Sequence, residues 1–204
     1  RLGISKLDNL AVHGLNLTKH LEWAIHGEGR ELFEWAKEEN LIGQVGFSSH
    51  GPIPLITKAI NSGSFDFCSL HLHLLNPTRI PLAHLALNAG MGVMAISPAD
   101  KGGQLQAPSK TLVDDCKPFS PLRLAYRYLL SEGISTLTLG ASQPQDFYLA
   151  KELINEGGEL SSFEKEALQK LKRNRNKRLG DTNCHQCREC IPCPKNVPIP
   201  ELLQ

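Results

Sequence analysis

Four cysteines lie close together near the C-terminal end of the sequence, and a proline follows the last of them: Cys184, Cys187, Cys190, Cys193 and Pro194. Two residues separate each cysteine from the next. This spacing lets successive thiolates turn toward one small inorganic core, as in the C-x₂-C-x₂-C run with a Cys-Pro that binds a [4Fe–4S] cluster in bacterial ferredoxins. The sequence therefore predicts an iron–sulfur cluster held by these cysteines.

The fourth ligand of this cluster has two candidates. The usual run has about three residues before its last cysteine, whereas two residues separate Cys190 from Cys193. Cys193 is the expected ligand, and Cys116 is a spare that the fold would have to bring close.

Two other chemistries use clustered cysteines. A Cys₄ zinc site is one alternative, although zinc usually takes two C-x₂-C pairs separated by a longer spacer. A pair of redox-active thiols is the other. Structural disulfides explain the pattern poorly, because the opening residues, Arg1-Leu2-Gly3-Ile4, do not resemble a secretory signal.

Histidines and small polar residues form a second set of candidates. They follow five short apolar runs, as His13-Gly14, Ser48-Ser49-His50-Gly51, His71 with His73, Ser97-Pro98 and Gly140-Ala141-Ser142. A single serine or glycine in such a place is an ordinary turn former. The recurrence of these residue types at equivalent positions favours a ligand-binding face.

The apolar runs themselves predict β-strands, and the amphipathic segments between them predict helices. The expected strands are Asn9–Val12, Gln44–Phe47, Asp66–Leu72, Gly92–Ile96 and Thr136–Leu139. The expected helices lie near Gly29–Glu39, Ile53–Asn61, Pro81–Ala89, Pro121–Ser131 and Pro144–Asn155. In the first of these helices an apolar stripe is expected, formed by Leu32, Phe33, Trp35 and Ala36.

This alternation predicts an α/β fold with parallel strands joined by right-handed crossovers. The two common forms are an open doubly wound sheet and a (β/α)8 barrel of the TIM type. No G-x-G-x-x-G turn follows a strand, which weakens the case for a dinucleotide-binding open sheet. Because a barrel needs eight strand–helix units, we expect the visible units to be strands 4–8 only.

Composition limits the classes of partner. The 204 residues include 22 Lys+Arg and 21 Asp+Glu, which gives a formal charge of +1, and 41% of the residues are hydrophobic. This balance argues against a nucleic-acid-binding protein, which usually has a clear excess of Lys and Arg. No apolar run approaches the roughly 20 residues that span a bilayer. We therefore expect a cytoplasmic protein with neither nucleic acid nor membrane as a partner.

The character of the sequence changes after Gly157-Gly158. Ser161–Arg178 predicts a charged helix with a basic C-terminal end. That end is either a solvated helix terminus or a docking patch for an acidic redox partner protein. The expected domains are a barrel portion, residues 1–156, and a helical extension with the small iron–sulfur segment, residues 157–204.

Several of the predicted strands resemble those of the aldo/keto reductase family. Leu7–His13 resembles the fourth barrel strand, which ends in a catalytic histidine, and Ile42–Ser49 resembles the fifth, whose polar end holds the nicotinamide carboxamide. Gly92–Pro98, with the loop Asp100–Gly103, resembles the seventh strand and its pyrophosphate loop. Thr136–Ser142 resembles the eighth strand and the turn beside the adenine-side phosphate. The resemblance covers about residues 7–155.

The C-terminal tail is similar to that of one subgroup of this family. Members of the subgroup carry a ferredoxin-like [4Fe–4S] segment that ends in Cys-Pro and Ile-Pro-Glu, here Ile199-Pro200-Glu201. The resemblance therefore implies the same cluster as the cysteine spacing does.

What the resemblance implies is an oxidoreductase in which NAD(P)H passes hydride to a small carbonyl substrate. It implies that His13 is catalytic and polarises the carbonyl oxygen. The implied cofactor contacts are Ser48, Ser49, Ser97, Gly140 and Ser142.

The sequence also departs from the family. The Asp, Tyr and Lys of the catalytic tetrad belong to the first three strands, so we expect this chain to be incomplete and inactive alone. The sixth strand lacks the usual Gln and Tyr and has His71 and His73 in that region, and Ala150 replaces a frequent Asn. These departures keep a second hypothesis open, a non-catalytic iron–sulfur module for electron transfer or scaffolding.

Overall fold

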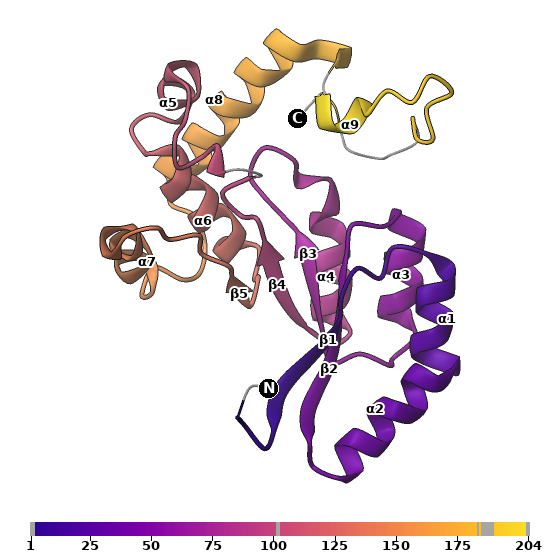
Figure 1. Cartoon of the computed structure of the whole chain (residues 1–204). Helices are drawn as coiled ribbons and strands as arrows, with labels where there is room; N and C mark the ends of the chain where they lie inside the picture. The colour runs from indigo at the N-terminus through magenta and orange to yellow at the C-terminus, as the bar shows by residue number, and fades with distance from the viewer. Residues whose placement is uncertain (1–2, 101–102, 183, 185–189, 203–204) are drawn as a thin grey trace. The chain divides into compact units, whose positions relative to one another are not determined.

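The computed structural model describes residues 3–100, 103–182, 184 and 190–202 (Figure 1). The chain divides into two compact units, each built from separate stretches of sequence. Unit 1 contains residues 1–72, 79–98 and 132–139, and unit 2 contains residues 73–78, 99–131 and 140–204. The expected domain boundary near residue 157 falls inside unit 2.

Unit 1 contains a sheet of parallel strands that pair in chain order. The strands are β1 (Leu7–Val12), β2 (Ile42–Ser49), β3 (Phe67–His71), β4 (Gly92–Ile96) and β5 (Thr136–Leu137). This sheet confirms the predicted α/β class and all five expected strands. The register pairs Gly46 of β2 with Phe67 of β3, and a Cβ at Gly46 would lie 2.5 Å from the Phe67 ring. Glycine is therefore required there for the two strands to approach.

Helices on one side of this sheet complete unit 1 (Figure 1). They are α1 (Thr18–His26), α2 (Glu28–Glu38), α3 (Ile53–Asn61) and α4 (Ile80–Asn88), and the 3₁₀ turn η1 (Pro77–Arg79) precedes α4. Helix α1 was not expected from the sequence, although Leu21, Ala24 and Ile25 are buried at the i, i+3, i+4 spacing of an amphipathic helix. The unit 1 core joins these side chains to Phe47 and Leu70 of the sheet.

Helix α2 packs differently from the prediction. Of the predicted apolar stripe, Ala36 is buried and Phe33 is half-buried, but Leu32 and Trp35 are 49% and 52% exposed. The Phe33 ring meets the Trp23 ring of α1 edge to face, with centroids 5.8 Å apart. A Cβ at Gly29 would lie 2.8 Å from the same Trp23 ring. Gly29, Phe33 and Ala36 share one face of the helix, and packing on that face leaves Leu32 and Trp35 outside.

Unit 2 consists of helices and turns around a second core. The helices are α5 (Lys110–Cys116), α6 (Pro121–Ser131), α7 (Tyr148–Leu153), α8 (Ser162–Leu179) and α9 (Ile199–Leu202), with 3₁₀ turns η3 (Pro144–Phe147) and η4 (Gly180–Thr182). The core contains Leu105, Cys116, Leu124, Ala125 and Leu171, with smaller contributions from neighbouring residues. Among the residues that the structure describes, no helix has the length and apolarity needed to cross a membrane.

A buried ion pair joins α6 to the start of α8. Nε of Arg127 donates to Oε1 of Glu164 at 2.8 Å, and the two side chains are 5% and 6% exposed. Arg127 also donates to the carbonyl oxygens of Glu156 and Glu159, the latter at 2.9 Å. Burial raises the pKa of Glu164, but hydrogen bonds from Arg127 and Ser161 outweigh it and lower that pKa below its usual value.

Helix α8 begins with a capped first turn. Ser161 caps the helix, because its Oγ accepts from the backbone N–H of Glu164 at 3.2 Å. The Glu164 carboxylate accepts in return from the backbone N–H of Ser161 at 2.7 Å, which completes a capping box. One carboxylate thus serves the cap and the ion pair.

The basic end of α8 binds within unit 2. Nζ of Lys170 donates to the carbonyl oxygen of Asp114 at 2.7 Å, which satisfies a free carbonyl near the end of α5. Asp115 accepts from Asn174 at 2.6 Å and from Arg178 at 2.5 Å. Arg175 donates to the carbonyl oxygen of Leu75. These polar groups have structural partners, and the cations left exposed on the helix are Lys172, Arg173 and Lys177.

We expect Glu164→Gln to destabilise the protein by about 3–5 kcal/mol, because it leaves the buried Arg127 charge without its counter-ion. The measurement is urea unfolding at pH 7, followed by circular dichroism. Glu166→Gln, on the exposed side of the same helix, is the control and should change the free energy of unfolding by less than about 0.5 kcal/mol. Equal effects of the two substitutions would contradict this account of the ion pair.

Candidate active site

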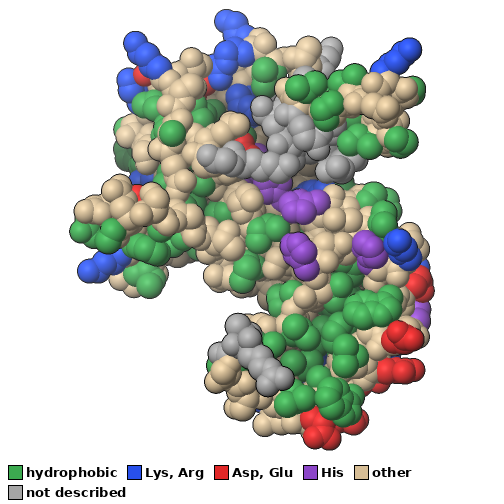
Figure 2. Space-filling view, viewed as in Figure 1, with side chains coloured by type: hydrophobic (Ala, Val, Ile, Leu, Met, Phe, Trp, Pro, Cys, Tyr) green, Lys and Arg blue, Asp and Glu red, His purple; other side chains and the backbone are tan. Residues whose placement is uncertain are grey.

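The carboxyl ends of the parallel strands of unit 1 meet at one edge of the sheet, where α/β folds collect their functional side chains. His13 follows β1, Ser48 and Ser49 end β2, His71 ends β3 and Ser97 follows β4. Figure 2 shows several histidine side chains on the face of the molecule that Figure 1 presents. The sheet therefore brings together the histidines and serines that the sequence singled out in unit 1.

His13 is the most accessible polar side chain of this group. It is exposed, and its Nδ1 lies 3.3 Å from Oγ of Ser48. The same Oγ accepts from the backbone N–H of Gly14 at 3.0 Å. Nε2 of His13 has no hydrogen-bond partner within the described residues, so this nitrogen is open to a ligand.

Ser49 ties the loop after β1 to the loop after β2. Its side chain is completely buried, and its Oγ donates to the carbonyl oxygen of Leu15 at 2.6 Å. The oxygen also accepts from the backbone N–H of Gly51 at 3.0 Å. The Ser49 hydroxyl is thus used in hydrogen bonds to the backbone of the two loops. A direct contact between Ser49 and a cofactor stays a prediction.

Two polar residues that the sequence reasoning missed also fix these loops. Oδ1 of Asn16 accepts from the backbone N–H of His50 at 2.7 Å. Nη2 of Arg79 donates to the carbonyl oxygens of His50 and Gly51, at 3.2 and 3.1 Å. An asparagine four residues beyond the end of a predicted strand was the available signal for the first, since Asn side chains often bond loop backbone. Arg79 carried no local signal, because its partners lie far away in the sequence.

His50 and His71 form a ring pair in unit 1. Their ring centroids lie 5.7 Å apart in an edge-to-face arrangement. His50 comes from the loop that Asn16 and Arg79 hold, and His71 ends the neighbouring strand. The pair extends the line of histidines along the strand ends.

Ser97 has an unusual backbone. It follows β4 with a φ of 55°, in the left-handed region that residues other than glycine rarely adopt. Its side chain is half-buried. Strained backbone of this kind is concentrated at ligand-binding sites, which agrees with the predicted cofactor contact but does not test it.

The other two predicted cofactor residues belong to unit 2. The carbonyl oxygen of Gly140 accepts from Nε2 of Gln106 at 2.8 Å. Ser142 donates through its backbone N–H and its Oγ to one oxygen of Asp146, at 2.8 and 3.1 Å. These contacts close the turn before η3. The backbone hydrogen bonds from Ser142 and Gln143 lower the pKa of Asp146, so its carboxylate stays charged beside Ser142.

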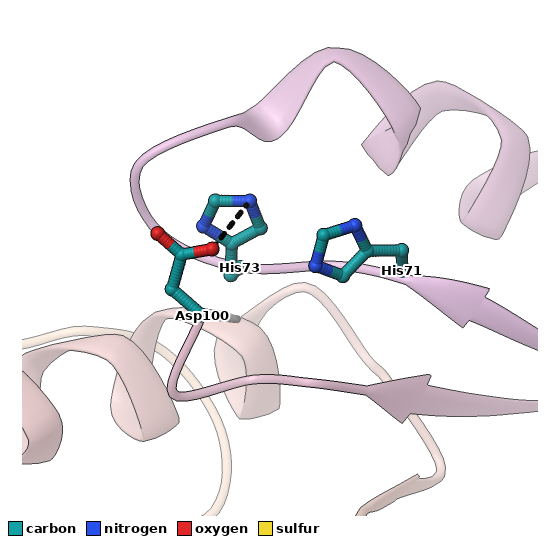
Figure 3. Close-up of side chains that lie close together, drawn as sticks. All are labelled: His71, His73 and Asp100. Atoms are coloured by element: carbon teal, nitrogen blue, oxygen red, sulfur yellow. Dashed lines mark ion pairs between the residues drawn. The ribbon is translucent and has the colours of Figure 1, made fainter. Parts of the chain in front are cut away.

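His73 has a different environment from that of the histidines in unit 1. It follows His71 by two positions in the chain and lies in unit 2, where its Nε2 is 3.7 Å from Oδ1 of Asp100 (Figure 3). The His73 side chain is 4% exposed. Burial lowers its pKa, and although Asp100 opposes this shift, Arg175 reinforces it. His73 is therefore a neutral, buried ring at pH 7, with a structural place in its own unit.

Three of the four clustered cysteines can be described, and Cys187 lies outside the described residues. Cys184 and Cys193 are half-buried and Cys190 is exposed. Cys116, the spare fourth ligand of the sequence analysis, is completely buried in the core of unit 2. Burial, together with the charge of Asp115, raises the pKa of its thiol to about 11. Cys116 is therefore packed inside a core, and Cys193 stays the predicted fourth ligand.

The fold is similar to that of solved aldo-keto reductases. One from Bacillus halodurans, in its holo form, matches with a TM-score of 0.68 and 20% identity, covering 83% of this chain and 60% of its own. A glycerol dehydrogenase from Gluconobacter oxydans matches with a TM-score of 0.60 and 17% identity, and the match covers 85% of this chain and 60% of the dehydrogenase. An aldo-keto reductase from Klebsiella pneumoniae in complex with NADPH matches with a TM-score of 0.59 and 18% identity, and the match covers 82% of this chain and 59% of the reductase.

The chain has part of an aldo-keto reductase barrel fold. It spans about 60% of the length of these structures. No protein-family model matches the chain, and a search of curated proteins finds no match to its sequence. The likeness is therefore one of fold, and the activity follows as a proposal.

We expect Ser49→Ala to destabilise the protein by about 1–3 kcal/mol, because the substitution leaves the Leu15 carbonyl and the Gly51 N–H without their buried partner. Urea unfolding gives this value. Ser69→Ala, on the neighbouring strand, is the matched control and should have a smaller effect, since no hydrogen bond of its hydroxyl ties two loops together. If Ser49→Ala lowers the free energy of unfolding no more than Ser69→Ala does, the Ser49 hydroxyl does not brace the two loops.

Proposed function

We propose that this chain is part of an oxidoreductase of the aldo/keto reductase type, which reduces a small carbonyl compound with NAD(P)H. The observation that carries the proposal is the position of His13. The side chain is exposed at the carboxyl end of β1, one ring nitrogen is held by Ser48, and the other has no partner among the described residues. The similarity of fold to aldo-keto reductases supports the same assignment.

His13 then acts on the carbonyl oxygen of the substrate. An imidazole N–H donated to that oxygen stabilises the negative charge that develops when hydride reaches the carbonyl carbon. The polar side chains that end β1 to β4 are histidines and serines, so the proton that the alkoxide finally takes needs another donor. In the family that resembles this chain, the donor is a tyrosine of the first three strands, and we propose that those strands complete the enzyme.

The residues around the strand ends fit a nicotinamide cofactor in part. Ser97 offers a half-buried hydroxyl on left-handed backbone beside the end of β4, which suits close contact with a ligand. Ser48 keeps an acceptor lone pair for an amide N–H, since a hydroxyl oxygen has two. When bound, the cofactor supplies the hydride. We propose Ser97 and Ser48 as the best supported contacts of the cofactor. Gly140, Ser142 and Ser49 are proposed as further contacts.

We further propose that the C-terminal cysteines hold a [4Fe–4S] cluster. The donor set fits, because the side chains of Cys184, Cys190 and Cys193 are no more than partly buried, and cysteine thiolates are the usual ligands of such clusters. When bound, the cluster would exchange single electrons. The exposed cations Lys172, Arg173 and Lys177 precede it along the chain and offer a surface to an acidic redox partner in the cytoplasm.

One alternative remains, a non-catalytic iron–sulfur module for electron transfer or scaffolding. The observation that favours it is the lack of a tyrosine or lysine at the described ends of β1 to β4. The two functions differ in the cofactor they require. A module has no need of NADPH, whereas the reductase binds it whether or not the substrate is known.

We expect the chain to bind NADPH, and Ser97→Asp to weaken this binding at least tenfold, because a carboxylate beside the cofactor phosphates is repelled. Fluorescence titration with NADPH measures the dissociation constant. The control is Ser5→Asp, which adds the same charge at an exposed site before β1, at the opposite edge of the sheet. Equal affinity of both variants, or no binding by any of the proteins, would favour the module.

We expect protein purified without oxygen to contain about four iron and four acid-labile sulfide per chain, by the formula of the cluster. Cys190→Ser should lose most of this iron and the brown colour. Cys116→Ala should retain both, since Cys116 is buried in the core. Metal analysis and the visible spectrum give the result. One zinc per chain and no colour would replace the cluster with a structural zinc site.

A further inference from the structure

Ser48 contacts two groups of the loop after β1. Its Oγ lies 3.0 Å from the backbone nitrogen of Gly14 and 3.3 Å from Nδ1 of His13. These are its two side-chain hydrogen-bond contacts within the described residues. The direction of each bond decides which nitrogen of His13 carries a proton.

The bond from Gly14 has one possible direction. A backbone N–H only donates, so the Ser48 oxygen accepts from it. The hydroxyl proton of Ser48 then needs an acceptor, and Nδ1 of His13 is the one within reach. A neutral imidazole that accepts at Nδ1 carries its proton at Nε2.

The opposite direction would change which end of the ring can donate. If Nδ1–H donated to Ser48, the hydroxyl proton would have no acceptor among the described residues and would turn to solvent, because the contact is exposed. Nε2 would then be a bare acceptor, unable to donate to a carbonyl oxygen. The first arrangement keeps the hydroxyl proton within the contact and leaves a donor at the open end of the ring.

The backbone fixes both partners of this contact. Gly14 adopts a φ of 68°, a left-handed turn that suits glycine and that directs its N–H at Ser48. The backbone N–H of Leu15 donates to the carbonyl oxygen of Ser48 at 2.8 Å. Nδ1 of His20 lies 3.1 Å from the carbonyl oxygen of Gly14. The loop therefore has little freedom to move away from Ser48.

We infer that Ser48 is a positioning residue that holds neutral His13 in the Nε2–H tautomer and aims this donor at the substrate side of the strand ends. The catalytic meaning of the inference rests on the proposed function, in which His13 donates to a carbonyl oxygen. Ser48 then has two roles: its hydroxyl proton bonds His13, and its remaining lone pair can accept from the cofactor amide. One hydroxyl then links the cofactor to the donor state of the histidine.

The test is the tautomer of His13, read by ¹⁵N NMR of ring-labelled protein above the pH at which the imidazoles titrate, without cofactor or substrate. We expect one tautomer in the wild type, with the proton at Nε2, and a measurable share of the Nδ1–H form in Ser48→Ala. Ser48→Thr keeps the hydroxyl and should restore the single tautomer. Ser69→Ala makes the same change at the register partner of Ser48 on β3 and should match the wild type.

Three results would overturn the inference: an Nδ1–H form in the wild type, no change in Ser48→Ala, or a change of equal size in Ser69→Ala. Backbone amide spectra of each variant show whether the fold is kept, and the tautomer of the wild type still tests the inference if Ser48→Ala unfolds. NADPH binding tests the proposed function separately, because the tautomer is measured on the free protein. A fixed tautomer without NADPH binding would leave the geometry intact and remove only its catalytic meaning.

Discussion

The parallel pairing of β1 with β2 determines which side chains can meet at the candidate site. The register sets Val12 opposite Phe47, so the next residues lie side by side, His13 just beyond the end of β1 and Ser48 still within β2. Side chains alternate between the two faces of a strand, and a shift of one residue would exchange Ser48 with Ser49. Ser49 is completely buried and braces the loops, whereas Ser48 reaches the histidine. Ser48 and Ser49 therefore cannot exchange roles.

The sequence was sufficient for the parts of the fold that repeat a pattern. Short apolar runs predicted all five strands, and the charged stretch from Ser161 predicted α8, because those signals lie within a few residues of one another. Helix α1 was missed, since its apolar residues followed a polar loop at the end of a strand. Half of the predicted stripe of α2 was wrong, because the helix packs through the face that holds Gly29, Phe33 and Ala36 and leaves Leu32 and Trp35 exposed.

The candidate site shows the same division between local and distant information. His13, Ser48 and Ser97 were found from their places after predicted strands, a local signal. The partners that hold them were not. Arg79 donates to the carbonyl groups of His50 and Gly51, 29 and 28 positions earlier, and nothing near Arg79 in the sequence indicates such a bond. The basic end of α8 is a further example, because the sequence alone does not show that Arg178 donates to Asp115. Composition shows which charges exist, and only the fold shows which of them are paired.

The way the chain is shared between the two units has a consequence for how the protein can be divided. The chain passes from one unit to the other after residues 72, 78, 98, 131 and 139, so each unit is assembled from three stretches. No single cut by a protease, and no gene fragment ending at one boundary, yields one complete unit without pieces of the other. Neither unit can therefore be expressed as one uninterrupted stretch of this chain, unlike modules joined by a simple linker. Exchange of the cysteine segment between proteins would have to begin within unit 2, beyond the last of these crossings.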